Sequence, residues 1–369
     1  MLKYIKNFIA KETVLCIAAI CALGTMLVIP PDPEYLHYID FRVLCLLFCL
    51  MAVVAGLKAI GLFEWLTYQM LRRIKSGRIL SISLVMLPFF SSMFITNDVA
   101  LIIFIPFTLT LLEQMECSNK SIPITVLQTI AANLGSMATP VGNPQNLYLF
   151  AFYNMSIGDF FSVTIPLTAI SFLLLLAASI PVLPKKLPEQ TLKQVAVSNT
   201  KELTAYMGLF TLALLTVFKV IPYPVTTVIT VVVLLIVNRK LLKEIDYMLL
   251  LTFVCFFTVS ENLGRVDAIS KFLQDLLQSS TLLTAVGTSQ VISNVPAAIM
   301  LSGFSDQWKE MLAGVNIGGL GTPIASLASL ITIKFYLRRP DNKIVRFLIF
   351  FTFANLVALA ALLIFVHVI

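Results

Sequence analysis

Small polar residues interrupt apolar stretches at two places in the sequence, and the two places match each other. They read Ser-Met-Phe-Ile-Thr-Asn-Asp-Val-Ala at residues 92–100 and Ser-Gln-Val-Ile-Ser-Asn-Val-Pro-Ala at residues 289–297. Aligned without a gap, they place Thr96 on Ser293 and Asn97 on Asn294. Lipid cannot satisfy the polar groups of such a turn. Both asparagines offer an amide oxygen that can complete the oxygen shell of a cation such as Na⁺.

A second motif, Asn-x-Gly-x-x-x-Thr-Pro, follows each of these segments. It begins at Asn133 and again at Asn316, and the two copies align without a gap. Its turn-forming residues cannot continue a helix, and they present half-helix ends whose partial charges hold ions and anions. The candidate binding residues are Asn133, Gly135, Thr139, Pro140, Gly142, Asn143 and Asn146 in the first copy and Asn316, Gly318 and Thr322 in the second. The second copy has fewer amides, so we expect the substrate contacts to favour the first.

These residues also have a purely structural interpretation. Asn is a common helix N-cap or turn residue, and a Thr-Pro break can be a kink needed for packing. The repetition of both motifs in the same order favours a binding site. Asp98 is the candidate coupling residue, because a carboxylate inside an apolar hairpin is unfavourable and usually functional. The alternative for Asp98 is a solvated turn.

Two further charged residues occupy equivalent positions. The shift that places Gly61 on Gly264 also places Lys58 on Glu261. The two side chains could pair directly, could each serve one hairpin end, or could reach opposite membrane surfaces. We expect the second arrangement, with Lys58 near backbone carbonyls and Glu261 near N–H groups or Arg265, and with a role in coupling or gating.

The composition defines the protein class. With 59% hydrophobic and 12% charged residues, the chain of 369 residues has room for about ten apolar segments of about twenty residues. We expect an all-α polytopic membrane protein whose first partner is the lipid bilayer. The net charge of +7 arises from short loops and does not indicate nucleic-acid binding. No metalloprotease, phosphate-loop or prenyl-diphosphate motif is found, so we expect neither an enzyme nor a cofactor beyond a coupling ion, Na⁺ or H⁺.

Apolar segments and polar breaks divide the chain into two similar units. We expect membrane-spanning helices at 13–29, 41–61, 160–183, 204–220, 225–238, 247–263 and 343–367, and interfacial helices at 62–74 and 265–278. Re-entrant hairpins are expected at 79–112 and 281–303, and broken helices at 121–149 and 309–337. A cytoplasmic linker at 184–203 separates a first repeat, 1–183, from a second, 204–369.

The loop charges predict the orientation. Alternating the spans places most Lys and Arg residues, including Lys3, Lys6 and Lys11, on one side, which is therefore the cytoplasm. The N-terminus is then cytoplasmic, and the two hairpins enter from opposite faces. The units are thus inverted repeats, and the expected location is the inner (plasma) membrane.

The motifs resemble those of the ion transporter superfamily, which includes citrate transporters, divalent-anion:sodium symporters, sodium/proton antiporters and arsenite-efflux membrane proteins. Thr96-Asn97-Asp98 with Ser293-Asn294 is most similar to the citrate-transporter-like and arsenite branch. The resemblance implies an elevator mechanism and a homodimer. It also implies one cation site at Thr96, Asn97 and Gly135 and a mirror site at Ser293, Asn294 and Gly318. The symporters have Thr at the positions of Asp98 and Val295. The resemblance therefore does not by itself imply two intact sodium sites.

We therefore expect a secondary active transporter for a small anion or oxyanion, carboxylate- or arsenite-like, coupled to H⁺ or Na⁺. One alternative is a sodium/proton antiporter of the same superfamily, in which Asp98 binds the cation itself. A membrane enzyme or receptor without transport is a more distant alternative.

Overall fold

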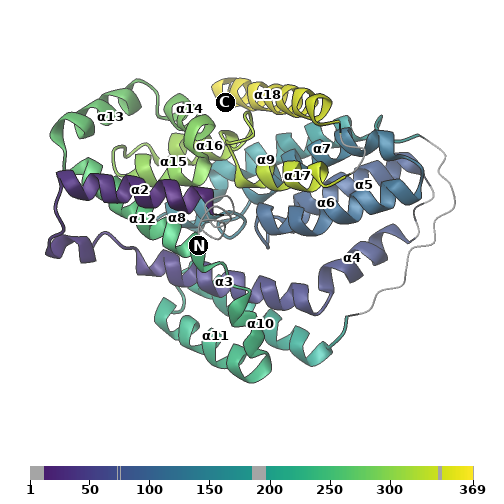
Figure 1. Cartoon of the computed structure of the whole chain (residues 1–369), viewed down its shortest axis with the longest axis horizontal. Helices are drawn as coiled ribbons and strands as arrows, with labels where there is room; N and C mark the ends of the chain where they lie inside the picture. The colour runs from purple at the N-terminus through teal and green to yellow at the C-terminus, as the bar shows by residue number, and fades with distance from the viewer. Residues whose placement is uncertain (1–11, 73, 75, 185–196, 340–342, 369) are drawn as a thin grey trace, which may run out of the picture.

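The chain folds into helices, as expected for an all-α polytopic membrane protein (Figure 1). A computed structural model describes residues 12–72, 74, 76–184, 197–339 and 343–368. The basic start, with Lys3, Lys6 and Lys11, lies outside these residues, as does most of the predicted linker. The linker ends earlier than the predicted residue 203, because helix α10 already begins at Thr200.

The helix bounds follow the predicted pattern closely. The first part contains α2 (Thr13–Val28), η1 (Pro33–Leu36), α3 (Phe41–Ala59), α4 (Leu62–Leu71), α5 (Gly77–Ser91), α6 (Asn97–Gln114), η2 (Ser118–Lys120), α7 (Ser121–Ser136), α8 (Pro144–Phe152) and α9 (Ile157–Ser179). The second part contains α10 (Thr200–Val217), α11 (Tyr223–Val237), η3 (Arg239–Lys243), α12 (Tyr247–Gly264), α13 (Asp267–Ser279), α14 (Thr281–Ile292), α15 (Asn294–Ser302), α16 (Trp308–Ile317), α17 (Leu327–Leu337) and α18 (Ile344–Val368).

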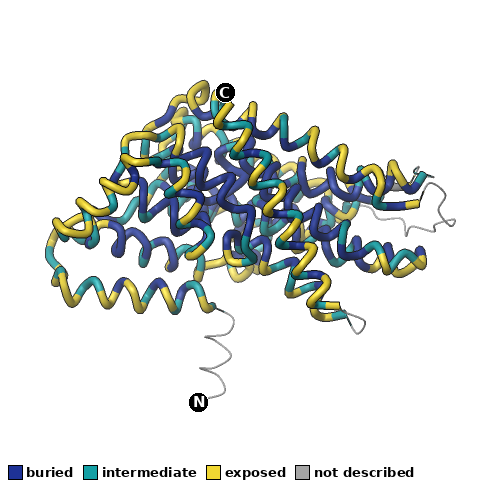
Figure 2. Tube along the Cα trace, turned by 90° about the horizontal axis from the view of Figure 1, so that it is seen from above, coloured by how far each residue is buried: buried dark blue, intermediate teal, exposed yellow. Residues whose placement is uncertain are grey.

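Several helices are suited to a lipid environment. Within the described part of the chain, five segments are long and apolar enough to cross a membrane: Pro33–Ala59, Asn97–Gln114, Ile157–Ser179, Tyr247–Gly264 and Ile344–Val368. Figure 2 shows buried segments in the middle of the molecule and long exposed stretches on the outer helices. Many exposed side chains are large and apolar, including Leu27, Ile236 and Val345. Apolar surface of this extent indicates contact with lipid.

The two halves pack against each other in a reciprocal way. Helix α2 packs on α12, and its counterpart α11 packs on α3. In the same manner α8 packs on α15, while α17 packs on α6. If each helix is replaced by its counterpart in the other half, the α2–α12 contact becomes the α11–α3 contact, and the α8–α15 contact becomes the α17–α6 contact. A two-fold relation between equivalent units produces this pattern. The contacts therefore extend the repeat seen in the motifs to the surrounding helices.

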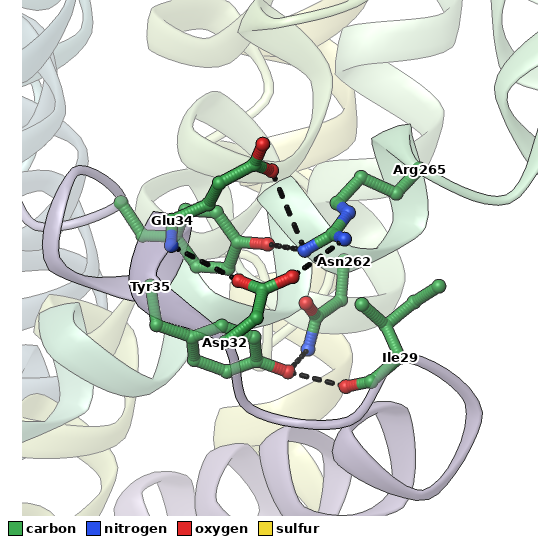
Figure 3. A network of polar contacts seen from close by, with 7 residues as sticks. Ile29, Asp32, Glu34, Tyr35, Asn262 and Arg265 are labelled. Carbon is green, nitrogen blue, oxygen red and sulfur yellow. Dashed lines mark hydrogen bonds and ion pairs between the residues drawn. The ribbon is translucent and has the colours of Figure 1, made fainter.

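A charged cluster joins the α2–α3 connection to the end of α12 (Figure 3). The Arg265 guanidinium forms an ion pair with Asp32 at 2.7 Å, and a longer one with Glu34 at 3.6 Å. Arg265 also donates a hydrogen bond to the Tyr38 hydroxyl at 2.7 Å. Beside them, the Asn262 amide donates to the Tyr35 hydroxyl at 2.9 Å. These contacts fix α2 to α12 at one end of the helix pair.

We expect Arg265→Met to lower the melting temperature slightly, by about 1–2 °C, because exposed ion pairs stabilise proteins weakly. The hydrogen bond from Arg265 lowers the pKa of the Asp32 carboxyl below its ordinary value of 3.8. A carboxyl with a lowered folded pKa stabilises the protein above its unfolded pKa and loses this effect only as the pH falls through the folded pKa. Thermal unfolding at pH 6 and pH 8 should therefore show the same decrease. A decrease found only at pH 8 would contradict this account.

Candidate functional site

Each hairpin contains one residue with the same unusual backbone conformation. Thr96 has φ 64° and ψ 148°, and Ser293 has φ 75° and ψ 154°. This region is nearly exclusive to glycine and costs other residues about 1–3 kcal/mol. The two tips therefore fold alike at aligned positions. Glycine would relieve this strain at both positions.

Asn97 begins α6, and its side chain is buried. Its amide oxygen accepts a hydrogen bond from the Asp98 N–H, and its amide nitrogen donates to Oδ1 of Asn133, both at 2.9 Å. Asn133 donates in turn to the Gly319 carbonyl at 3.3 Å and accepts from the Ser326 hydroxyl at 3.0 Å. The first hairpin tip is thus connected through Asn133 to the break between α16 and α17.

Asn294 reaches the same region from the second half. Its backbone N–H donates to the Ala325 carbonyl at 3.0 Å. Its amide nitrogen lies so near Gly319 that a Cβ on this glycine would come within 2.8 Å of it. Asn97 and Asn294 are therefore connected through Asn133 and Gly319, although they lie far apart in the sequence. The structure thus brings the two predicted tips together.

The threonines of the Thr-Pro motifs hold the hairpin tips. The Thr139 hydroxyl donates to the Met93 carbonyl, and the Thr322 hydroxyl donates to the Gln290 carbonyl at 3.0 Å. Met93 and Gln290 are aligned residues of the two hairpins, so the two bonds are equivalent. Each broken helix is thereby fixed to its own hairpin. Pro140 follows Thr139 in the turn that ends α7.

Several amides meet at the breaks. Asn316 donates to Oδ1 of Asn146 at 2.7 Å, and Asn143 donates to the Ser136 hydroxyl at 2.6 Å. The Asn146 amide nitrogen faces carbonyl oxygens at 3.3–3.5 Å, those of Ser136, Met137 and Thr139. Oδ1 of Asn143 and Oδ1 of Asn316 are buried without a hydrogen-bond partner among the described residues. Because buried polar atoms are rarely unpaired, these oxygens are candidate contacts for an ion, a substrate group or water.

Two glycines permit close backbone contacts at the first break. A Cβ at Gly135 would lie 2.0 Å from the Phe89 carbonyl oxygen, and one at Gly142 would lie 2.1 Å from the Ser136 carbonyl oxygen. Neither backbone atom can move independently of its helix. Gly135 thus allows α7 to approach α5 directly beside the tip. Its counterpart Gly318 is also closely packed, with the Ser289 side chain 2.8 Å from the position of a Cβ.

We expect Gly135→Ala to reduce the free energy of unfolding by about 1–3 kcal/mol, because overpacking must push α5 away from α7. Thermal unfolding of the purified protein measures the effect. Gly287→Ala is a matched control in helix α14, since nothing lies within 4 Å of its Cβ position. The control should retain or gain stability, because alanine favours a helix more than glycine does. Equal melting temperatures for Gly135→Ala and the wild type would contradict the close contact.

Gln290 is a site residue that the sequence motifs do not identify. Its amide nitrogen donates to the carbonyls of Gly318 and Leu320, both at 2.9 Å. Its amide oxygen accepts from the Thr322 N–H at 2.8 Å. From its position in the hairpin, the side chain thus forms hydrogen bonds with the backbone groups that follow the end of α16. The sequence does contain one indication of Gln290. In the alignment of the two hairpin segments it stands opposite Met93, and this is one of two positions where a polar residue of one segment aligns with an apolar residue of the other.

We expect Gln290→Met to lower the melting temperature of the protein by several degrees. The methionine cannot donate, so two carbonyls lose their partner, and each unsatisfied buried group costs about 1–3 kcal/mol. Gln278→Met, on the exposed surface of α13, is the control and should unfold like the wild type. If both variants unfold at the same temperature, the amide does not support the break.

The charged candidates have different surroundings. Asp98 lies in the first turn of α6, and its Oδ1 is buried without a hydrogen-bond partner among the described residues. Lys58 and Glu261 are both exposed, and neither side chain bonds to another described residue. Arg265 pairs with Asp32 instead of Glu261. The described residues thus show none of the contacts expected for Lys58 and Glu261 at the hairpin ends.

Comparison with known proteins identifies relatives of the chain. A family model described as citrate transporter matches residues 5–306. An uncharacterized transporter of Methanocaldococcus jannaschii is 35% identical over 317 residues, which cover 86% of each chain. The inner membrane protein YbiR of Escherichia coli is 31% identical over 300 residues, or 80% of each chain. A silicon efflux transporter of Oryza sativa is 35% identical over 122 residues, which are 33% of this chain and 24% of that protein.

Proposed function

The chain belongs to the citrate transporter family, and we propose that it is a secondary active transporter that moves a small anion or oxyanion across the inner (plasma) membrane. The observation that carries the proposal is the connection from Asn97 through Asn133 and Gly319 to Asn294. It joins two re-entrant tips and two broken helices at one place. Interrupted segments that meet in this way are typical of transporter binding sites.

The buried polar groups favour a substrate with several oxygen atoms. No Lys, Arg, Asp or Glu is fully buried in the described part of the chain, whereas many Asn, Gln, Ser and Thr residues are. Amides and hydroxyls both donate and accept hydrogen bonds, which suits a weak oxyacid or a carboxylate. The silicon efflux transporter of rice supports the oxyacid class, and the family description supports the carboxylate class.

The two hairpins differ in a way that suggests how ions are coupled to transport. The first carries Asp98, whose buried oxygen can accept a proton or contact Na⁺. The second hairpin carries Val295 at that position. The backbone carbonyls at the break of the second half accept hydrogen bonds from the Gln290 amide. We therefore place the coupling ion, H⁺ or Na⁺, at the first hairpin. In this proposal no Na⁺ is needed near Asn294.

An elevator motion fits the packing of the helices. Both hairpins and both broken helices contact one another, and α2, α3, α10, α11 and α12 form a second group of packed helices. We propose that the first group carries the substrate past the second, in a homodimer whose N-termini are cytoplasmic. Lys58 and Glu261 lie at the ends of α3 and α12, next to α4 and α13, where gating could act.

Reconstituted transport tests the proposal. Purified protein in liposomes should take up citrate, arsenite or silicic acid only when a proton or sodium gradient is imposed. Counterflow with each unlabelled compound then ranks the substrates. Uptake that needs neither gradient would contradict secondary active transport, and the absence of uptake of all oxygen-rich anions and oxyacids would contradict the substrate class.

A sodium/proton antiporter is the second candidate, and the unpartnered buried oxygen of Asp98 favours it. In that case the carboxylate itself binds the transported cation. The same liposomes distinguish the two functions through a pH-sensitive dye inside the vesicles. Proton flux driven by sodium alone, without an added anion or oxyacid, identifies the antiporter.

A further inference from the structure

A basic pocket lies between the beginnings of α7 and α18, which pack together (Figure 1). Its volume is about 760 Å³. Lys120 lies at the N-cap of α7, Lys343 directly precedes α18, and Arg346 lies in the first turn of α18. No Asp or Glu lines the pocket, and none of the three cations forms an ion pair with a described residue. Three positive charges, none of them paired with a described residue, therefore surround one space.

The two helices increase the positive potential of this pocket. Helix α7 has 16 residues and α18 has 25, and both begin at the pocket. The N-terminus of a helix carries a partial positive charge and favours phosphate and other anions. The pocket thus combines three side-chain charges with two helix ends. Phosphate is the anion that this combination suits best, because it has several acceptor oxygens and negative charge.

The rest of the lining is apolar. Ile349 and Phe353 line the pocket one and two turns beyond Val345, on the same face of α18, and each side chain is 67% exposed. This face continues along a helix that is apolar enough to span the membrane. A free phosphate ion would leave the apolar part unfilled. A ligand that fits both parts has an anionic head and hydrocarbon chains.

We propose that this pocket binds an anionic phospholipid, with its phosphate among Lys120, Lys343 and Arg346 and its acyl chains along Ile349 and Phe353. Alternating the expected spans places Lys120 and the loops at 239–243 and 338–346 on the side where Lys and Arg collect, which is the side predicted to be cytoplasmic. Anionic lipids are concentrated in that leaflet, and basic pockets between helices bind their head groups there.

Lipid titration of the full-length protein tests the proposal. Phosphatidylglycerol is added to the detergent-purified protein, and native mass spectrometry counts the molecules retained. We expect one tightly bound phosphatidylglycerol per chain, weaker binding of phosphatidylcholine, and no competition by free inorganic phosphate at equal concentration. The triple variant Lys120→Gln, Lys343→Gln, Arg346→Gln should bind about 100-fold more weakly, because each cation near the membrane surface contributes about fivefold.

A second triple variant is the matched control. Arg239, Lys240 and Lys243 are exposed in η3 on the same predicted side but do not line the pocket. Their replacement by Gln should leave the tightly bound phosphatidylglycerol in place. Each single variant should bind phosphatidylglycerol about fivefold more weakly than the wild type. These variants test the pocket if the triple variant does not fold. Equal lipid binding by the wild type and the pocket variants would overturn the proposal. So would a change from dimer to monomer in the pocket variant, which would identify a subunit interface instead.

Discussion

Replacing Asn133 with Leu should abolish transport, with a decrease of at least about 100-fold in the initial rate of uptake. Leucine has nearly the shape of asparagine but removes three hydrogen bonds, those with Asn97, Ser326 and Gly319. Each buried group left unpaired costs about 1–3 kcal/mol, so the first tip loses its connection to the second half. A loss of about 2.7 kcal/mol already corresponds to 100-fold. Uptake into liposomes, normalised to reconstituted protein, measures the effect.

Asn355→Leu is the control for this substitution. Asn355 is also a fully buried asparagine, but it lies in α18, and within the described part of the chain its amide donates only to the Phe351 carbonyl of its own helix. Its replacement should leave the transport rate within about twofold of the wild type, because no contact between the halves is lost. If Asn355→Leu and Asn133→Leu reduced uptake equally, the loss would reflect general damage to the fold. Wild-type uptake by Asn133→Leu would exclude the amide chain from the transport site.

The second large effect is expected from Asp98→Asn, which should remove the pH dependence of transport while changing substrate affinity much less. An amide resembles the protonated carboxyl in shape and cannot exchange a proton, so the variant remains in one state at every pH. A ratio of rates between pH 5 and pH 8 that exceeds about tenfold in the wild type should fall to about one. Initial uptake rates over this range, with the substrate concentration varied, separate the two effects.

Asp246→Asn serves as the control for Asp98→Asn. Asp246 is the other carboxylate that acts electrostatically on Asp98. Its side chain caps α12 by accepting from the Leu249 N–H at 2.9 Å, and asparagine can accept the same bond. This variant should still transport at a pH-dependent rate, because it keeps the Asp98 carboxyl, although its pH profile should shift once the charge of Asp246 is removed. An unchanged pH profile in Asp98→Asn would refute its coupling role. Loss of sodium-driven proton flux in the absence of any other substrate would instead support the antiporter.

The sequence alone predicted the hairpins, the broken helices and the membrane class. Thr96 and Ser293 interrupt apolar runs, and Thr139-Pro140 and Thr322-Pro323 lie in the breaks after α7 and α16, where proline disfavours a helix for local steric reasons. Such signals depend on neighbouring residues only, so they can be read without coordinates. The alignment of the two halves is also a property of the sequence, and it correctly identified Asn97 and Asn294 as residues of equivalent tips.

Only the tertiary structure decided which of these residues touch. Asn133 bonds across the halves to Ser326 and Gly319, and Gln290 supports the carbonyls of Gly318 and Leu320. These contacts depend on the distance between backbones from separate segments, to within a few tenths of an ångström, which local pattern does not contain.

The same reason explains why the sequence, which places Lys58 and Glu261 at equivalent positions, does not show which residues they contact; both are exposed in the structure. Sequence fixes the type and order of the helices because turns and apolar runs act locally. The site is formed when the two halves pack together, because its hydrogen-bond partners come from both of them.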